Sequence, residues 1–172
     1  MKRTYSREEY LEKISMIRAA RRPISVTSDI IVGFPGETPK DVDETLSLLE
    51  AAQYDGVFAF QYSPRPNTSS LQMDDGISEE EKGRRLAIVQ DRQREIQISR
   101  NNALIGETFE VLVDGASRRP ASPAGSPGQW SGRSSSNRIL NFTSPHSGLL
   151  GQYVHVRVTG AAPNSLVGEQ VI

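Results

Sequence analysis

The stretch SDIIVGFPGETPKD, residues 28–41, predicts a buried strand that turns abruptly into a helix. Its β-branched run stops at Gly33, where two glycines and a proline bend the chain. Thr38 is a typical helix N-cap residue, and Pro39 suits the first helical position. We therefore expect a strand over 24–32 that is buried on both faces, followed by a helix.

The segments on either side of this stretch alternate between helix and strand. A capping box formed by Ser6 and Glu9 predicts a helix that ends before Pro23. Residues 57–62 are typical of a second strand, and another capping box predicts a long helix over 78–100. This alternation of helices and strands is typical of parallel α/β architecture.

After residue 101 the pattern changes to short strands separated by glycine-rich turns. We expect these strands over 107–114, 137–143, 153–159 and 166–172. Closely spaced strands of this kind favour a small β-barrel. Residues 117–136, SRRPASPAGSPGQWSGRSSS, are so rich in Ser, Pro and Gly that they predict a mobile loop. The sequence thus predicts an α/β domain over 1–100 followed by an all-β domain over 101–172.

The composition excludes several classes of protein and site. The 172 residues contain no cysteine, which excludes disulfides, thiolate zinc sites and iron–sulfur ligation by this chain. No apolar run approaches the roughly 18 residues of a membrane span, so we expect a soluble cytoplasmic protein. The net charge is −1, and a weak basic bias after residue 101 does not by itself indicate nucleic-acid binding.

The turn after the first predicted strand is a candidate ligand site. Gly33 and Gly36 allow a ligand to approach the backbone closely, because no Cβ blocks the way. Glu37 would accept hydrogen bonds from a ligand amine or hydroxyl, beside the free N–H groups that begin the next helix. The alternative is a tight strand-to-helix turn with an acidic residue near the helix start.

Two further groups of residues are candidates for anion or RNA binding. In YSPRPNTSS, residues 62–70, two prolines hold Arg65 in an extended segment, where it suits phosphate or carboxylate recognition. In the β-rich half, Arg133, Arg138 and Phe142 combine charge with an aromatic ring, as in proteins that contact RNA phosphates and stack on bases. The alternatives are a solvated arginine in a stiff loop, and a core phenylalanine beside surface arginines.

The order of these motifs resembles the C-terminal part of the radical S-adenosylmethionine tRNA methylthiotransferases. The resemblance runs through MKRTYSREEY, TSDIIVGFPGET, FAFQYSPRPNTSS, EEKGRRL, NNALIGETFEVLVDG, SGRSSSNRILNF and SLVGEQV. It implies that 1–100 is the second half of a radical S-adenosylmethionine (βα) barrel. It also implies that 101–172 is a TRAM domain, a small RNA-binding β-barrel. Asn67 departs from the family pattern, which commonly has glycine after YSPRP.

The resemblance also implies roles for individual residues, none of them catalytic or metal-binding. S-adenosylmethionine would be enclosed by the strand-end motif and nearby positions, namely Gly33, Phe34, Gly36, Glu37, Arg3, Tyr62 and Ser63. RNA would be bound by Arg65, Arg118, Arg119, Arg133, Arg138 and Phe142. The implied partner is a tRNA anticodon stem-loop, and the implied full-length enzyme is a monomer.

The activity that the resemblance implies is methylthiolation of isopentenyl-adenosine beside the anticodon. In this family a cluster-bound S-adenosylmethionine yields a radical that abstracts hydrogen from the base carbon. The cysteine ligands of the 4Fe–4S clusters are absent here, so we expect a fragment that is inactive alone. Relatives acting on threonylcarbamoyl-adenosine also keep an arginine at Arg65 and remain an alternative. A non-enzymatic RNA-binding module is another.

Overall fold

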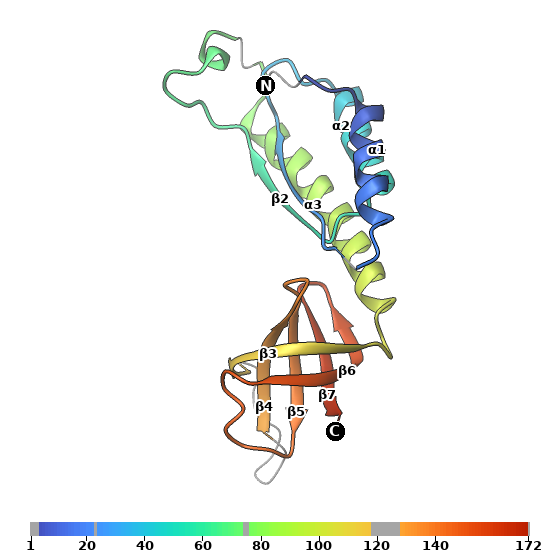
Figure 1. Cartoon of the computed structure of the whole chain (residues 1–172). Coiled ribbons are helices and arrows are strands. Elements are labelled where there is room, and N and C mark those ends of the chain that lie inside the picture. The colour runs from blue at the N-terminus through green and yellow to red at the C-terminus, as the bar shows by residue number, and fades with distance from the viewer. Residues whose placement is uncertain (1–3, 23, 74–75, 118–127, 172) are drawn as a thin grey trace. The chain divides into compact units, whose positions relative to one another are not determined.

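The computed structural model describes residues 4–22, 24–73, 76–117 and 128–171. The chain divides into two compact units, residues 1–96 and residues 97–172 (Figure 1). The first unit mixes helices with a small sheet, and the second is a β-barrel. Among the described residues, no helix combines the length and apolar character that a membrane span requires.

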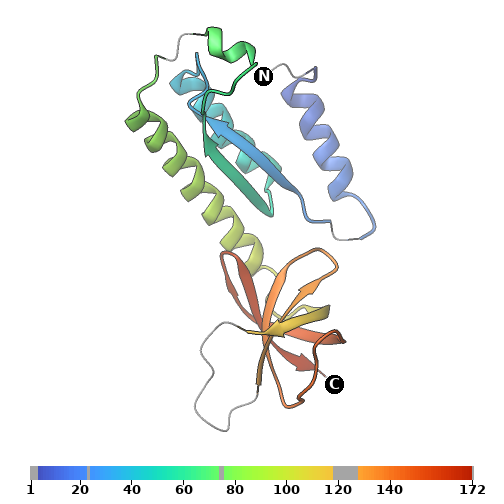
Figure 2. The ribbon, with the colours of Figure 1, turned by 90° about the vertical axis from the view of Figure 1, so that its left-hand side faces the viewer.

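The first unit is built on two parallel strands, β1 (Thr27–Val32) and β2 (Gly56–Gln61). Three α-helices and one 3₁₀ helix accompany them: α1 (Arg7–Arg18), α2 (Pro39–Ala52), η1 (Ser69–Gln72) and α3 (Glu79–Asn102). Figure 2 shows the strands side by side in front of α2, with no helix covering the sheet face toward the viewer. The predicted parallel α/β pattern is therefore confirmed.

The helix starts follow the capping residues that the sequence contains. The Ser6 side chain accepts from the Glu9 amide, and the Glu9 carboxylate accepts from the Ser6 amide, which completes a capping box. Thr38 and Asp41 form the same reciprocal pair at α2. Hydrogen bonds from Thr38, mainly from its backbone N–H, lower the pKa of Asp41. Both predicted caps are confirmed.

The core of the first unit lies between the sheet and the helices. Its buried members are Ile14, Val32, Leu49, Ala52, Tyr54, Val89 and Ile96. The Tyr54 hydroxyl lies 2.7 Å from that of Tyr10, and burial together with this hydrogen bond raises the pKa of Tyr54. The packed side of the sheet therefore contains polar contacts among its aliphatic side chains.

The expectation that the first strand is buried on both faces is wrong. β1 begins at Thr27, and its residues alternate between exposed and more buried positions. Ile31 is 37% exposed, and Phe58 and Phe60 on the neighbouring strand are 63% and 53% exposed. In the parallel register Ile31 lies opposite Phe60, so these side chains share one face. The helices cover the other face. A run of β-branched residues does not show whether one face of a strand or both faces are buried.

The second unit is a closed five-stranded barrel with strand order β3-β4-β5-β7-β6. Its strands are β3 (Thr108–Ala116), β4 (Gly128–Ser134), β5 (Ile139–Ser144), β6 (Tyr153–Ala162) and β7 (Ser165–Val171). All neighbours are antiparallel except β5 and β7. The buried core residues are Val111, Val113, Leu140, Phe142, Leu149, Val154, Val156, Val158 and Leu166. The predicted small β-barrel is confirmed.

Strand β4 lies within the segment predicted as a mobile loop, so that prediction is wrong for 128–134. The small residues of this strand fit tight packing between neighbours. A Cβ on Gly132 would lie 2.4 Å from the backbone oxygen of Leu112. Ser134 is only 7% exposed, and Trp130 lies opposite Phe142 in the register with β5. Small residues are needed here because the neighbouring strand leaves no room for larger ones. Composition alone does not distinguish such a strand from a glycine- and serine-rich loop.

We expect Gly132→Ala to destabilise the barrel by about 1–3 kcal/mol, because the new methyl group overlaps the backbone of β3. Urea unfolding followed by the fluorescence of Trp130, the one tryptophan of the chain, measures this loss. Gly115→Ala in β3 is the matched control, because a Cβ there meets nothing within 4 Å. Equal unfolding midpoints for the two variants would contradict the steric explanation.

Candidate functional site

A pocket of about 660 Å³ lies in the first unit, next to the C-terminal ends of β1 and β2. Its wall is formed by Ile31, Phe34, Phe60, Gln61, Tyr62, Ser63, Arg65, Thr68, Ser69, Ser70 and Met73. The carboxyl ends of parallel strands are where ligands bind in α/β folds, since loops of free sequence converge there. This pocket is therefore the candidate ligand site of the first unit.

The pocket brings together some of the residues predicted to bind a cofactor and leaves out others. Phe34, Tyr62 and Ser63 line it, and so does Arg65, which was predicted to bind RNA. Gly33, Gly36 and Glu37 belong to the adjoining turn and are not among the lining residues. Arg3 lies outside the described residues.

The turn after β1 needs glycine for packing against α3. Gly33 and Gly36 adopt φ values of +71° and +85°, a region that side chains disfavour. A Cβ on Gly33 would lie 2.4 Å from Cγ of Lys82, whose side chain is 2% exposed. The aliphatic part of the Lys82 side chain thus occupies the space that a Cβ on Gly33 would need. A Cβ on Gly36 would meet open space.

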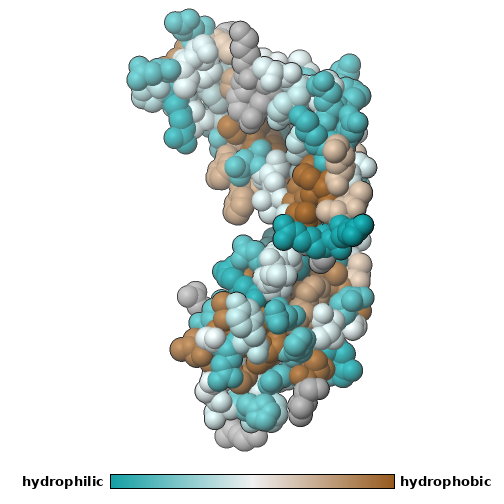
Figure 3. All heavy atoms as spheres, in the orientation of Figure 1, coloured by the Kyte–Doolittle hydropathy of each residue, from teal (hydrophilic) through white to brown (hydrophobic). Residues whose placement is uncertain are grey.

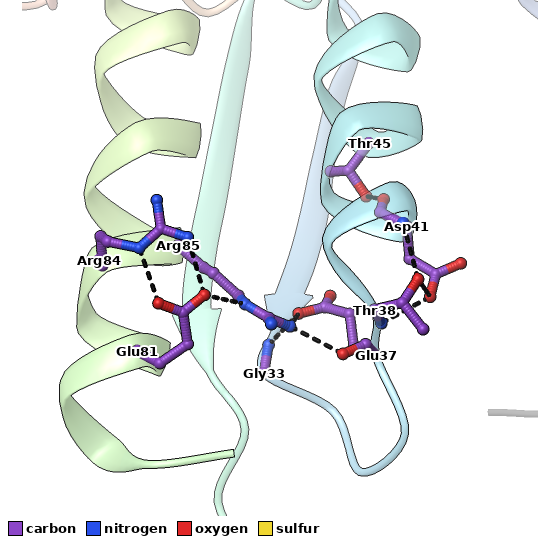
Figure 4. A network of polar contacts seen from close by, with 8 residues as sticks. All are labelled: Gly33, Glu37, Thr38, Asp41, Thr45, Glu81, Arg84 and Arg85. Carbon is purple, nitrogen blue, oxygen red and sulfur yellow. Dashed lines mark hydrogen bonds and ion pairs between the residues drawn. The ribbon is translucent and has the colours of Figure 1, made fainter.

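The carboxylate of Glu37 fixes this turn to α3 (Figure 4). Its Oε2 accepts a hydrogen bond of 2.7 Å from the Gly33 amide and one of 2.8 Å from Nη1 of Arg85. The same Nη1 donates to the Glu37 carbonyl oxygen at 2.9 Å, and Nε of Arg85 donates to Glu81 at 2.8 Å. The side chains of Arg85 and Glu37 are only 6% and 11% exposed. In the structure Glu37 holds the turn; its contact with a cofactor stays a prediction.

The aromatic wall of the pocket rests on the same helix. The Phe34 and Tyr62 rings meet edge to face with centroids 5.1 Å apart. Nζ of Lys82 lies 5.7 Å from the Tyr62 ring centroid and 2.8 Å from Glu79. Lys82 therefore contacts both the Gly33 turn and the Tyr62 ring.

Sequence analysis did not single out Lys82 and Arg85, which contact the turn and the Tyr62 ring from α3. Both belong to EEKGRRL, and a charged run at the start of a polar helix is more typical of a solvated face. Their spacing of three residues places them on one side of α3, where they meet the turn. That spacing was the one signal in the sequence that could have identified these two residues as contacts of the glycine-containing turn.

The segment after β2 forms the polar rim of the pocket. Arg65 is exposed between two prolines, and its carbonyl accepts a hydrogen bond of 2.7 Å from the Thr68 hydroxyl. Asn67 adopts φ +63°, which asparagine tolerates better than most residues. The replacement of the family's glycine at this position is therefore compatible with a left-handed turn.

The lining residues indicate which ligands would fit. Phe34, Phe60 and Tyr62 offer apolar surface to a flat ring. Arg65 offers a guanidinium to a carboxylate or phosphate, and the rim hydroxyls can donate or accept. The pocket suits a ligand that joins an aromatic ring to a polar or anionic group.

The barrel places the residues predicted to bind RNA in different surroundings. Arg133 is half-exposed, with Nε 3.6 Å from Asp114 and Nη1 2.9 Å from the Asn137 side chain. Arg138 donates to the Asn101 side chain at 2.7 Å. Phe142 is 2% exposed and lies in the barrel core, so the prediction that its ring stacks on RNA is wrong. Arg118 and Arg119 lie outside the described residues.

Both units match the sequences of known proteins. Residues 102–171 match the TRAM domain family. The chain is 53% identical, over 98% of its length, to the tRNA-2-methylthio-N(6)-dimethylallyladenosine synthase of Solibacter usitatus. The chain is homologous to part of these synthases. Proteins of the same name from Koribacter versatilis and Geobacter metallireducens are 51% and 45% identical, over 99% and 100% of the chain.

The match confirms the resemblance to the C-terminal part of the tRNA methylthiotransferases and the TRAM assignment of the barrel. The chain spans only 37% of the length of the Solibacter relative and 38% of the Koribacter relative. The residues that form the pocket and the barrel therefore lie in a segment that the longer relatives match in sequence.

We expect Arg85→Met to destabilise the first unit by roughly 1–3 kcal/mol, because it leaves the nearly buried Glu37 carboxylate without its guanidinium partner. Amide exchange at Gly33 should accelerate with it, since that amide donates to the same carboxylate. Arg84→Met is the matched control, because Arg84 also pairs with Glu81 but is 59% exposed. If both variants exchange at Gly33 like the original chain, the turn does not depend on Arg85.

The acidic end of the same network predicts a pH dependence. Hydrogen bonds from Arg84 and Arg85 lower the pKa of Glu81 from 4.5 to about 2. A carboxyl whose pKa is lower in the folded state stabilises that state above the unfolded pKa and loses this effect as pH falls. We expect the melting temperature of the helical signal to fall less steeply between pH 4.5 and about 2 in Glu81→Gln. Glu80→Gln, which removes an adjacent exposed carboxylate, should keep the original slope.

Proposed function

We propose that this chain forms the RNA-binding barrel and part of the cofactor pocket of a radical S-adenosylmethionine methylthiotransferase that modifies tRNA. The base would be the isopentenyl (dimethylallyl) adenosine beside the anticodon. The observation that carries the proposal is the pocket at the ends of parallel β1 and β2, in a chain whose following barrel matches the TRAM family. The names of the relatives describe synthesis of this methylthiolated nucleoside in tRNA.

The first part of the proposal concerns residues 1–100, which would be the second half of a radical S-adenosylmethionine (βα) barrel. In such a barrel helices cover the outer face of the strands, and side chains of the inner face fill the interior. Ile31, Phe58 and Phe60 are exposed on the face that the helices leave open. Apolar side chains on that face suit an interior completed by further strands.

The second part concerns the cofactor. Phe34 and Tyr62 would pack against the adenine ring of S-adenosylmethionine, and the Ser63 hydroxyl would hydrogen-bond its polar groups. Gly33 and Glu37 would keep the Phe34 wall in place through their contacts with α3, Gly36 would leave the turn open to the cofactor, and Arg3 would contact the cofactor. When bound to a 4Fe–4S cluster, this cofactor supplies the radical that activates the base carbon.

The residues of this chain do not fit the cluster itself. Its 172 residues include no cysteine, and thiolates are the usual ligands of such clusters. The ligands of any cluster would therefore come from polypeptide beyond these residues, in line with the fraction of its relatives that the chain spans. The contribution of this chain would be to hold the cofactor and the RNA.

The third part concerns the partner, which we propose is a tRNA anticodon stem-loop. Arg65 at the pocket rim would bind a phosphate near the target base, and Arg133 and Arg138 would bind phosphates along the barrel. Arg118 and Arg119 would add to this contact. Binding would weaken with salt, since counterions are released when arginines meet phosphates. We propose that the full-length protein is a cytoplasmic monomer.

An exchange of segments tests the proposal. This chain replaces the matching part of the Solibacter usitatus synthase, and the chimera is expressed in a bacterial host that lacks its own tRNA methylthiolation. We expect mass spectrometry of digested tRNA to detect 2-methylthio-N6-dimethylallyladenosine. Arg65→Ala in the chimera should reduce this product at least about 10-fold, because the loss of a charge-assisted phosphate contact costs on that order. Arg94→Ala, an exposed arginine of α3, should not.

The products distinguish the alternatives. A methylthiolated threonylcarbamoyl-adenosine would identify the other substrate. An unmodified tRNA, made by a chimera that folds and still binds the stem-loop, would favour a non-enzymatic RNA-binding module.

A further inference from the structure

Three side chains form a continuous row across the outer face of the barrel. Leu112 on β3 lies directly opposite Arg133 on β4 and directly opposite Tyr153 on β6. Directly opposite residues of neighbouring strands point to the same side of the sheet, with side chains within contact range. Arg133, Leu112 and Tyr153 therefore lie side by side over about 10 Å, the width of two strand spacings.

The row is open to solvent although two of its members are apolar. Tyr153 is 68% exposed and Leu112 is 38% exposed, whereas their chain neighbours Val111 and Val154 are 0% and 7% exposed. Figure 3 shows apolar residues among hydrophilic ones on the visible face of the barrel. A ring that is 68% exposed on its own barrel is available to a partner.

We propose that this row is the barrel's contact with an unpaired RNA base, which stacks on Tyr153 while Arg133 binds the adjoining phosphate. Leu112 between them would cover the edge of the base and exclude water. The combination of an exposed aromatic ring with a nearby arginine is how small β-barrels hold single strands. The inference rests on the proposed tRNA partner and names the surface that would hold it, in place of the buried Phe142.

The charges around the row favour an unpaired base over a duplex. Arg133 reaches Asp114 at 3.6 Å with both side chains about half exposed, so exchanging this carboxylate for a phosphate costs little. Glu110, which is exposed, lies opposite His155 in the next outward pair of the same strands. Asp114 and Glu110 weaken the attraction of Arg133 to a phosphate backbone, so the ring has to supply much of the affinity.

Fluorescence anisotropy with a labelled RNA hairpin tests the row in the complete 172-residue chain. We expect Tyr153→Ala to weaken binding about 5- to 100-fold, the effect of losing one aromatic stacking contact. Tyr153→Phe should bind within about 2-fold of the original chain, because the ring remains. Arg133→Ala should lower the slope of log affinity against log salt by about one, while Tyr153→Ala should leave that slope unchanged.

The control is Ile105→Ala, which removes a 50% exposed apolar side chain before β3. Its neighbour Gly106 bonds to Val158, five residues along β6 from Tyr153 and so roughly 17 Å away. Unchanged RNA binding by Tyr153→Ala, or an equal loss of binding in Ile105→Ala, would overturn the proposed role of the row. The proposal of an RNA partner would remain. A chain that binds no hairpin at all would overturn both. Loss of self-association in Tyr153→Ala with RNA binding intact would assign the row to contacts between copies.

Discussion

The carboxylate of Glu37 receives hydrogen bonds from the Gly33 amide and from Arg85, and the pocket depends on this contact. A turn with two left-handed glycines has little conformational preference of its own, so it needs an external partner to adopt one form. Arg85 supplies that partner from α3, and Lys82 fills the space beside Gly33. The wall formed by Phe34 and Tyr62 is thereby set before any ligand arrives, which lowers the entropic cost of binding.

Local signals in the sequence were sufficient to predict most of the elements. Ser6 and Thr38 mark helix starts because their side chains can satisfy backbone amides whatever lies elsewhere in the fold. The alternation of valines around His155 is a signal of the same kind, since in the structure the valines are buried and the histidine is exposed. These features depend on a few neighbouring residues, so they can be read from one segment at a time.

The features that sequence analysis missed depend on what lies opposite a segment in space. Gly132 in β4 is needed because the backbone of β3 approaches it, and Gly168 in β7 meets the backbone of Arg157 in the same way. Nothing in the serine- and glycine-rich sequence around Gly132 distinguishes a barrel strand from a loop. Phe142 is a different case: it shares the phase of the buried Leu140 in β5 and lies in the core, whereas Tyr153 shares the phase of His155 in β6 and lies at the surface.

Strand β7 pairs with β5 on one side and with β6 on the other, although it follows both of them along the chain. While a ribosome is making the protein, β3 to β6 emerge first, and the edges of β5 and β6 that will face each other across β7 remain unpaired. These open edges are able to pair with other nascent chains until residues 165–171 leave the exit tunnel. The barrel therefore closes in one late step, although the strands that carry the outer row assigned to RNA, β4, β3 and β6, pair with one another without β7.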